Sequence, residues 1–263
     1  MSGKSPVRLD REDGIARIRF DRPEVYNALD DSSAVAFRDA CRAIAADSGI
    51  RCVVIEGEGR AFMAGGDISR FAAASGRAAA AVSDIITPFH QGLLTLRRQD
   101  APVVAALNGV VAGAGISLCL ACDLAVAAED ARFLFAYTGI GATPDGSGSF
   151  FLPRVVGLRR AMEIALFNEP FGAARALELG LVNRVVPRAD LSVEALALAA
   201  RLGEGPTRAF GAVRRLYEAS FGASLAEQLE AERMAFMAVT ETADFAEGCA
   251  AFRDKREPRF HGR

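Results

Sequence analysis

The alternation of apolar and polar residues along the chain predicts a mixed α/β fold. Residues 15–20, IARIRF, alternate strictly, a pattern typical of a half-buried β-strand. Short apolar runs predict further strands at residues 52–59, 102–107, 124–127 and 132–135. Apolar residues at helical spacing predict helices at residues 30–47, 78–98, 113–121 and 149–156, with Pro88 as a candidate break. Strands and helices that alternate in this way favour an α/β protein with a partly parallel sheet.

The last third of the chain has a different pattern. After about Glu163 the strand pattern fades, and residues 172–180 predict a short helix. Two longer amphipathic helices are predicted at residues 207–220 and 225–240. We therefore expect an α/β core over residues 1–200 and a helical region over residues 201–263.

The composition of the 263-residue chain argues against several classes of protein. Hydrophobic residues make up 51% of it, which is enough for a sizeable core. Its 31 basic and 33 acidic residues leave a net charge of −2, so the charge favours neither nucleic acid nor an anionic membrane surface as a partner. Residues 1–13 lack the apolar stretch of a secretory signal, and we expect a cytoplasmic protein.

The sequence favours neither a membrane-spanning segment nor a metal site. Residues 101–122 carry no charge and resemble a membrane span in length, but Pro102 and several glycines interrupt them. We interpret them as a buried strand, turn and helix. The five cysteines are irregularly spaced, and the lone C-x-x-C pair, Cys119 and Cys122, is expected to pack in the core. With only two histidines in the chain, we expect no metal site.

Two glycine-containing turns carry candidate chemistry. In GRAFMAGGDIS, residues 59–69, a strand ends and the chain turns at residues 65–66 before a helix. In NGVVAGAGISL, residues 108–118, the arrangement repeats around residues 113–115. Free backbone N–H groups at such turns can bind an anion or a developing oxyanion, although small residues there also serve close packing alone. No dinucleotide fingerprint or P-loop accompanies them, so no nucleotide cofactor is expected.

The string TPDGSGSF, residues 143–150, contains one ionisable residue, Asp145. Asp before Gly is good turn chemistry, because the Asp side chain bonds its own backbone and Gly tolerates positive φ. The alternative is a carboxylate held among apolar neighbours to move a proton. The aromatic and aliphatic residues expected to wall such a site are Phe71, Tyr137, Ile140, Phe150 and Phe151.

Several motifs occur in order over residues 8–263: DRPEVYNAL, GRAFMAGGDI, PVVAALNGVVAGAGISLCLACDLAVAAEDARF, PDGSGSFFLPRVVG, ALELGLVNRVV and FRDKREPRF. This set resembles the crotonase, or enoyl-CoA hydratase/isomerase, superfamily. The resemblance implies an α/β spiral of ββα units with a C-terminal helical region that forms homotrimers, which often pair into hexamers. It also implies acyl-CoA thioester substrates, with coenzyme A as part of the substrate and no separate cofactor.

The resemblance assigns roles to residues of both turns. Ala64 and Ala114 match the two backbone N–H donors that hold the thioester C=O. The segment that lines the adenine and pantetheine site is matched by Gly66, Asp67 and Ile68. Lys255 resembles a basic residue that reaches the CoA phosphates, sometimes across a subunit boundary, and an ordinary surface lysine is the alternative.

The resemblance also bears on the reaction. Hydratases of the superfamily use two glutamates, and the matching positions here are Ser117 and Tyr137, which are poor groups for activating water and protonating C2. Asp145 matches an aspartate of isomerase branches. The chain looks most like the phenylacetate-pathway branch, which acts on 3-enoyl-CoA and on ring-epoxide or oxepin CoA thioesters. In that case Asp145 would take a proton from C2 and return it at C4.

Three alternatives to an isomerase stay open. His90 matches a histidine of the 4-chlorobenzoyl-CoA dehalogenase branch, where the aspartate is a nucleophile, but that branch lines its ring pocket with tryptophans and this chain has none. A hydrogen-bonded helical histidine without a catalytic role is the simpler interpretation of His90. A hydratase and a non-catalytic acyl-CoA binder are the remaining alternatives. We expect Tyr137 and His90 to contact the substrate.

Overall fold

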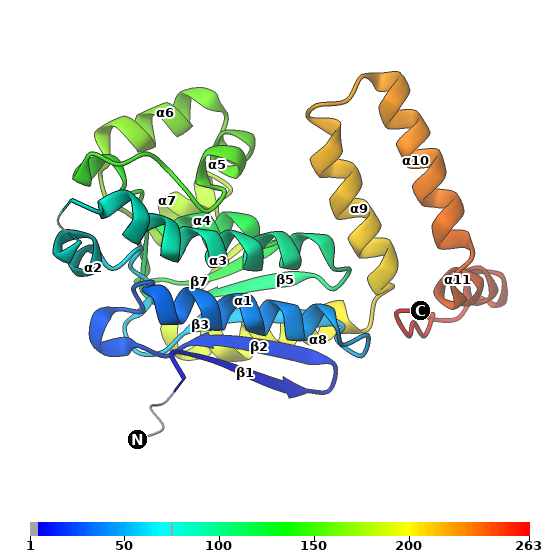
Figure 1. The fold of residues 1–263 in the computed structure, drawn as a ribbon. Helices are drawn as coiled ribbons and strands as arrows, with labels where there is room; N and C mark the ends of the chain where they lie inside the picture. The colour runs from blue at the N-terminus through cyan, green and yellow to red at the C-terminus, as the bar shows by residue number, and fades with distance from the viewer. Residues whose placement is uncertain (1–4, 75) are drawn as a thin grey trace.

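Two β-sheets organise the chain, of which the computed structural model describes residues 5–74 and 76–263 (Figure 1). Within the described residues, the larger sheet has six strands in the order β1-β2-β3-β5-β7-β10, and the smaller has four in the order β4-β6-β8-β9. The larger sheet comprises β1 (Val7–Glu12), β2 (Ile15–Phe20), β3 (Cys52–Gly57), β5 (Val103–Leu107), β7 (Leu124–Ala128) and β10 (Arg184–Val186). The smaller comprises β4 (Ala61–Met63), β6 (Val110–Ala112), β8 (Arg132–Leu134) and β9 (Phe171–Gly172).

A ββα arrangement recurs along the chain. Strands β3, β5 and β7 join the larger sheet in parallel, and each is followed by a short strand, β4, β6 or β8, that joins the smaller sheet in parallel. The helices that follow these pairs are α2 (Ile68–Ala73) with α3 (Ala78–Arg98), α4 (Ala114–Ala121) and α5 (Gly148–Val156). Because parallel strands end at the same edge of a sheet, the turns after β4, β6 and β8 lie close together.

Helices bury both faces of the larger sheet. Helix α1 (Asp31–Ala45) packs with α3 over one face, and α8 (Leu191–Gly203) packs on β3, β5 and β7 from the other (Figure 1). Successive residues of β3 alternate between two cores: Val53 and Ile55 face the core with α1 and α3, whereas Cys52 and Val54 face α8. Because both faces of β3 are buried, its sequence is a continuous run of apolar residues instead of an alternating pattern.

The remaining helices lie in the second half of the chain. Helices α6 (Leu158–Phe167) and α7 (Ala173–Glu178) follow α5, and α9 (Thr207–Ser220), α10 (Leu225–Thr240) and α11 (Ala243–Asp254) form the C-terminal region. Short 3-10 helices lie at Pro23–Val25, Thr138–Ile140 (η2) and Arg188–Asp190. Figure 1 shows α9 and α10 standing to one side of the two-sheet core.

A buried arginine fixes α9 to the core. The Arg214 side chain is 6% exposed and donates to both carboxylate oxygens of Asp123, at 2.8 and 2.6 Å. It also donates to the main-chain oxygens of Gln99 and Ala101. All of these acceptors lie just before β5 or β7 in the chain. Arg214 therefore fixes the position of α9 relative to these two strands.

The sequence predicted most of these elements. Each strand predicted in the first two thirds is present, and α3, α9 and α10 have the predicted bounds, with α3 continuous through Pro88. The strand pattern fades after about Glu163, and the sequence did not predict β9 and β10, which follow it. These strands have two and three residues, and pairing with β8 and β7, distant in sequence, creates them. Strand β1 and helices α6, α8 and α11 were also missed, whereas β4 and β6 are the strands expected before the two glycine turns.

Residues 101–122 form β5, β6 and α4, so their interpretation as a buried strand, turn and helix is confirmed. No helix of the described residues is long and apolar enough to cross a bilayer. Cys119 lies in the main core, where burial raises the pKa of its thiol to about 12. Cys122 packs against the same core, as predicted for this pair.

Candidate active site

The two glycine turns face each other at van der Waals distance. Strands β4 and β6 pair in parallel, and their turns leave the smaller sheet side by side. A Cβ atom built on Gly113 would lie 3.3 Å from the Cα of Gly65, and one built on Gly65 would lie 3.7 Å from the backbone N of Ala114. A Cβ on Gly115 would lie 2.3 Å from the main-chain oxygen of Met63, closer than real atoms approach. Glycine at residue 115 is therefore what allows the two turns to meet.

The backbone hydrogen bonds of the first turn decide which of its N–H groups are free. The N–H of Ala64 donates to the main-chain oxygen of Tyr26 at 3.0 Å, so the prediction that Ala64 supplies an oxyanion donor is wrong. Leu29 bonds the oxygen of Gly65 and the N–H of Asp67, both at 2.8 Å. In this parallel bridge the N–H of the intervening Gly66 points away from Leu29.

Gly66 and Ala114 thus offer one open donor from each turn. Within residues 5–74 and 76–263, the backbone N–H of neither residue has an acceptor in the protein. Ala114 is the first residue of α4, where helix geometry leaves N–H groups without intrahelical partners. Two open donors on facing turns can together bind one carbonyl oxygen.

The other predicted residues of the first turn have local roles. Asp67 is the N-cap of α2, accepting from the N–H of Ser69 at 3.1 Å. A second oxygen of Asp67 lies 3.7 Å from the Arg22 guanidinium. Ile68 exposes 55% of its surface and can meet a ligand directly.

A hydroxyl pair holds Asp145. The Tyr137 hydroxyl donates to Oδ1 of Asp145 at 2.5 Å, and the Ser117 hydroxyl donates to the main-chain oxygen of Asp145 at 2.8 Å. The two hydroxyl oxygens are 2.9 Å apart. Burial and the Asp145 carboxylate raise the pKa of Tyr137, so its hydroxyl stays protonated and acts as a donor.

His90 supports the same turn from α3. Its Nε2 atom accepts the N–H of Gly146 at 3.0 Å and lies 3.9 Å from Oδ2 of Asp145. In this geometry Nε2 is the acceptor of a backbone N–H and does not donate to the carboxylate. Gly146 has a φ of +55°, and a Cβ there would lie 2.7 Å from the Phe89 ring. Residues 145–146 therefore form the predicted Asp-Gly turn. The Asp145 side chain at this turn is 22% exposed.

Helix α4 joins the turns to the Asp145 cluster. Ala114 opens the helix, and Ser117 lies one turn later, about 5 Å along its axis. Helix α4 therefore contributes both the open N–H of Ala114 and the Ser117 hydroxyl that holds the main chain of Asp145. The structure brings together His90, Tyr137 and Asp145, as the sequence predicted. Ser117 lies beside Tyr137 and Asp145 in this cluster.

Lys255 is not part of this cluster within one chain. It follows α11 in the left-handed conformation, with a φ of +53°. Figure 1 places α11 at the far end of the molecule from α2. Any contact between Lys255 and a ligand at the glycine turns therefore needs a second copy of the chain.

The comparisons with known proteins agree with this fold. The profile of the family "Enoyl-CoA hydratase/isomerase" matches residues 10–263. An enoyl-CoA hydratase structure from Polaromonas sp. JS666 superposes with a TM-score of 0.91 at 35% identity, covering 97% of this chain and 99% of that one. The α/β fold with its parallel sheets and C-terminal helical region is thereby confirmed. The chain belongs to the enoyl-CoA hydratase/isomerase family, within the crotonase superfamily.

The similar curated proteins differ in chemistry. The chain is 38% identical to a Rhodobacter capsulatus protein named "Probable enoyl-CoA hydratase", over 98% of both chains. It is 36% identical to 4-chlorobenzoyl coenzyme A dehalogenase-1 of Arthrobacter sp, over 95% of this chain and 91% of that one. It is 33% identical to the 1,2-epoxyphenylacetyl-CoA isomerase of Escherichia coli K12, over 96% and 97%. Overall similarity thus defines the family, and the site residues must distinguish between reactions.

The contact between the turns gives a testable prediction. Replacing Gly115→Ala places a methyl group against the Met63 oxygen, so we expect the free energy of unfolding to fall by about 1–3 kcal/mol. Urea denaturation followed by circular dichroism measures this. Gly222→Ala is the matched control, since a Cβ there meets nothing within 4 Å. Equal stability of the two variants would contradict the close contact.

Proposed function

We propose that this protein is an acyl-CoA isomerase that shifts a double bond from C3 to C2 of a thioester, with Asp145 as the proton shuttle. One observation carries the proposal. Asp145 is the carboxylate of the cluster, with Oδ1 bonded to Tyr137, while both positions of the hydratase glutamates carry hydroxyls, and each hydroxyl donates to Asp145. One carboxylate suffices for a 1,3-proton shift, whereas adding water requires a group to activate water and a group to protonate C2.

The facing turns would hold the thioester carbonyl oxygen. In this proposal the donors are the N–H groups of Gly66 and Ala114, each worth about 2.7–4 kcal/mol when charge develops on the oxygen. The CoA portion would lie along Gly66, Asp67 and Ile68. Coenzyme A then enters only as part of the substrate, and the proton shift itself needs no separate cofactor.

The proton would move in two steps. Asp145 takes a proton from C2, and the C–H electrons form a dienolate whose charge rests on the oxygen held by Gly66 and Ala114. Asp145 then returns the proton at C4, which leaves the double bond between C2 and C3. The 33% identity to a 1,2-epoxyphenylacetyl-CoA isomerase supports ring-epoxide thioesters as a further substrate class for the same groups.

Conversion of trans-3-hexenoyl-CoA to the conjugated 2-enoyl thioester, followed by ultraviolet absorbance, tests the proposal. We expect Asp145→Asn to lower the rate by about 10²–10⁴-fold, the usual contribution of a general base. Asp130→Asn makes the same chemical change at an exposed side chain that pairs with Arg188, and should leave the rate unchanged. Tight binding of the thioester without conversion by the unaltered protein would instead indicate an acyl-CoA binder.

The position of His90 favours a second candidate, hydrolytic dehalogenation. With Nε2 only 3.9 Å from Oδ2 of Asp145, His90 could take a proton from water once Nε2 had released the N–H of Gly146 and Asp145 had displaced chloride from an aromatic ring. The resulting aryl ester would be hydrolysed by that water and release Asp145. The 36% identity to a 4-chlorobenzoyl coenzyme A dehalogenase supports the same candidate function.

Chloride release from 4-chlorobenzoyl-CoA distinguishes the two candidates. If the protein is an isomerase, we expect no chloride above the background of a protein-free sample. Chloride release that disappears in both Asp145→Asn and His90→Gln would favour the dehalogenase and contradict the isomerase as the main activity.

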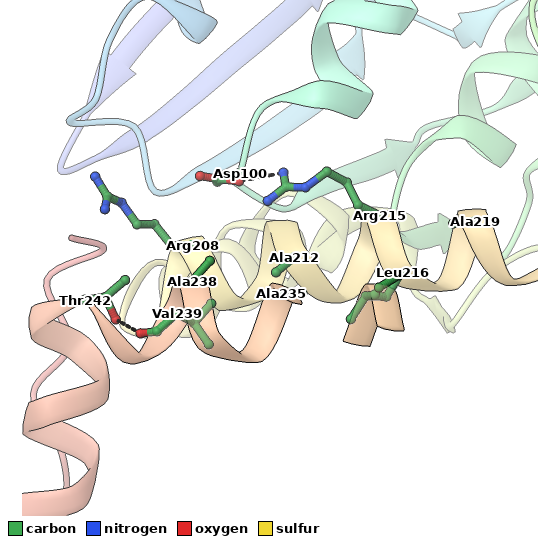
Figure 2. A pocket seen from close by; sticks show the side chains of 11 residues that line it. Asp100, Arg208, Ala212, Arg215, Leu216, Ala219, Ala235, Ala238, Val239 and Thr242 are labelled. Carbon is green, nitrogen blue, oxygen red and sulfur yellow. Dashed lines mark hydrogen bonds and ion pairs between the residues drawn. The ribbon is translucent and has the colours of Figure 1, made fainter. Parts of the chain in front are cut away.

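We also propose that the C-terminal helices form the contact of a homotrimer or hexamer. They expose large apolar side chains, which include Phe221, Leu225, Leu229, Phe236 and Phe252. A groove of about 580 Å³ lies between α9 and α10 (Figure 2), lined mainly by small and apolar residues with Arg208, Arg215 and Asp100 at its edge. So much exposed apolar surface is typical of an interface between proteins. In such an assembly Lys255 of one copy could reach the CoA phosphates bound to another.

Light scattering after gel filtration tests this assembly. We expect a mass of three or six times 27.8 kDa for the unaltered chain. Leu229→Glu, at a position that is 55% exposed on α10, should shift the mass toward the monomer. Val193→Glu on α8 is the matched control, because it adds the same charge at an exposed apolar position outside the C-terminal helices. A monomeric unaltered chain would contradict the proposal.

A further inference from the structure

We propose that Tyr137 is a positioning residue: it binds Oδ1 of Asp145, so that Oδ2 is the oxygen that meets the substrate. This inference rests on the proposed function and deepens it. Tyr137 and Ser117 stand where hydratases place acid–base groups, but here the Tyr137 hydroxyl donates to Oδ1 of Asp145 and the Ser117 hydroxyl to its main-chain oxygen. The two positions therefore orient a third residue instead of acting on water.

The hydrogen-bond network distinguishes the two carboxylate oxygens. Oδ1 receives the Tyr137 hydroxyl at 2.5 Å. Oδ2 lies 3.9 Å from Nε2 of His90, and that nitrogen accepts the N–H of Gly146, so it carries no hydrogen to donate. Among the described residues, the titratable groups facing the carboxylate are Tyr137, from the loop before η2, and His90, from α3. Because Nε2 of His90 accepts the Gly146 N–H, it does not donate to Oδ2, which stays open.

Burial keeps the hydroxyl pair in place. Ser117 is fully buried and Tyr137 is 9% exposed, while the Asp145 side chain is 22% exposed. Space around Ser117 is also tight, because a Cβ on Gly148 would lie 2.6 Å from its Oγ atom. The hydroxyls are thus behind the carboxylate, and Asp145 is the member of the network that a substrate can reach.

Direct titration of Asp145 tests the bond without any substrate. Carbon-13 NMR of labelled aspartate, with the Asp145 signal assigned by its loss in Asp145→Asn, gives the pH midpoint of the carboxylate. A donor to a carboxylate stabilises its charged form, so Tyr137→Phe should move this midpoint to higher pH. Ser117→Ala keeps the Tyr137 donor and should raise it less. An unchanged midpoint in Tyr137→Phe would overturn the proposal.

The kinetic effect distinguishes positioning from folding or binding. In trans-3-hexenoyl-CoA isomerisation, Tyr137→Phe should lower kcat by about 10²-fold with little change in KM, because a mobile carboxylate loses its alignment. The acidic limb of the kcat profile should move to higher pH in step with the NMR midpoint. Tyr217→Phe, at a side chain that is 71% exposed on α9, is the matched control and should change neither quantity.

The two parts of the test separate the inference from the proposed function. A shifted midpoint with no isomerisation by the unaltered protein means that Tyr137 holds Asp145 but the proposed reaction is wrong. Isomerisation that depends on Asp145, with full kcat and an unshifted pH profile in Tyr137→Phe, means that the reaction is right and the positioning role is wrong.

Discussion

The active site depends on one close contact, between the backbone of residue 115 and the carbonyl oxygen of Met63. A side chain at Gly115 would meet that oxygen at 2.3 Å, so the two ββα turns can approach only because glycine stands there. Their approach places the open N–H groups of Gly66 and Ala114 on facing segments. The parallel sheets and their buried faces serve to bring these two turns to the same edge.

Helix α4 connects this contact to Asp145. Its first residue offers an N–H, and its fourth, Ser117, bonds the main chain of Asp145 and approaches the Tyr137 hydroxyl. In the proposed function, hydroxyls stand at the positions of the two hydratase glutamates, and the aspartate of the Asp-Gly turn serves as the acid–base group in their place. His90 from α3 completes the support of that turn.

Local sequence patterns predicted much of this arrangement. The Asp-Gly turn, the glycine turns and the long helices are all determined by neighbouring residues, and the motif matches selected Asp145, Tyr137 and His90. The donor of the first turn was misassigned to Ala64 because the choice depends on Tyr26 and Leu29, which bond that turn across more than thirty positions of chain. Strands β9 and β10 were missed for the same reason, since tertiary pairing creates them. The direction of each hydroxyl hydrogen bond likewise follows only from three-dimensional proximity.

In the proposed reaction, a single carboxylate carries one proton from C2 to C4 of an acyl-CoA thioester. The most direct measurement uses 3-enoyl-CoA with deuterium at C2 and locates the label in the product by mass spectrometry and NMR. Transfer by one carboxylate predicts 2-enoyl-CoA with deuterium recovered at C4. A product that carries only solvent hydrogen at C4, or a 3-hydroxyacyl product, would contradict it.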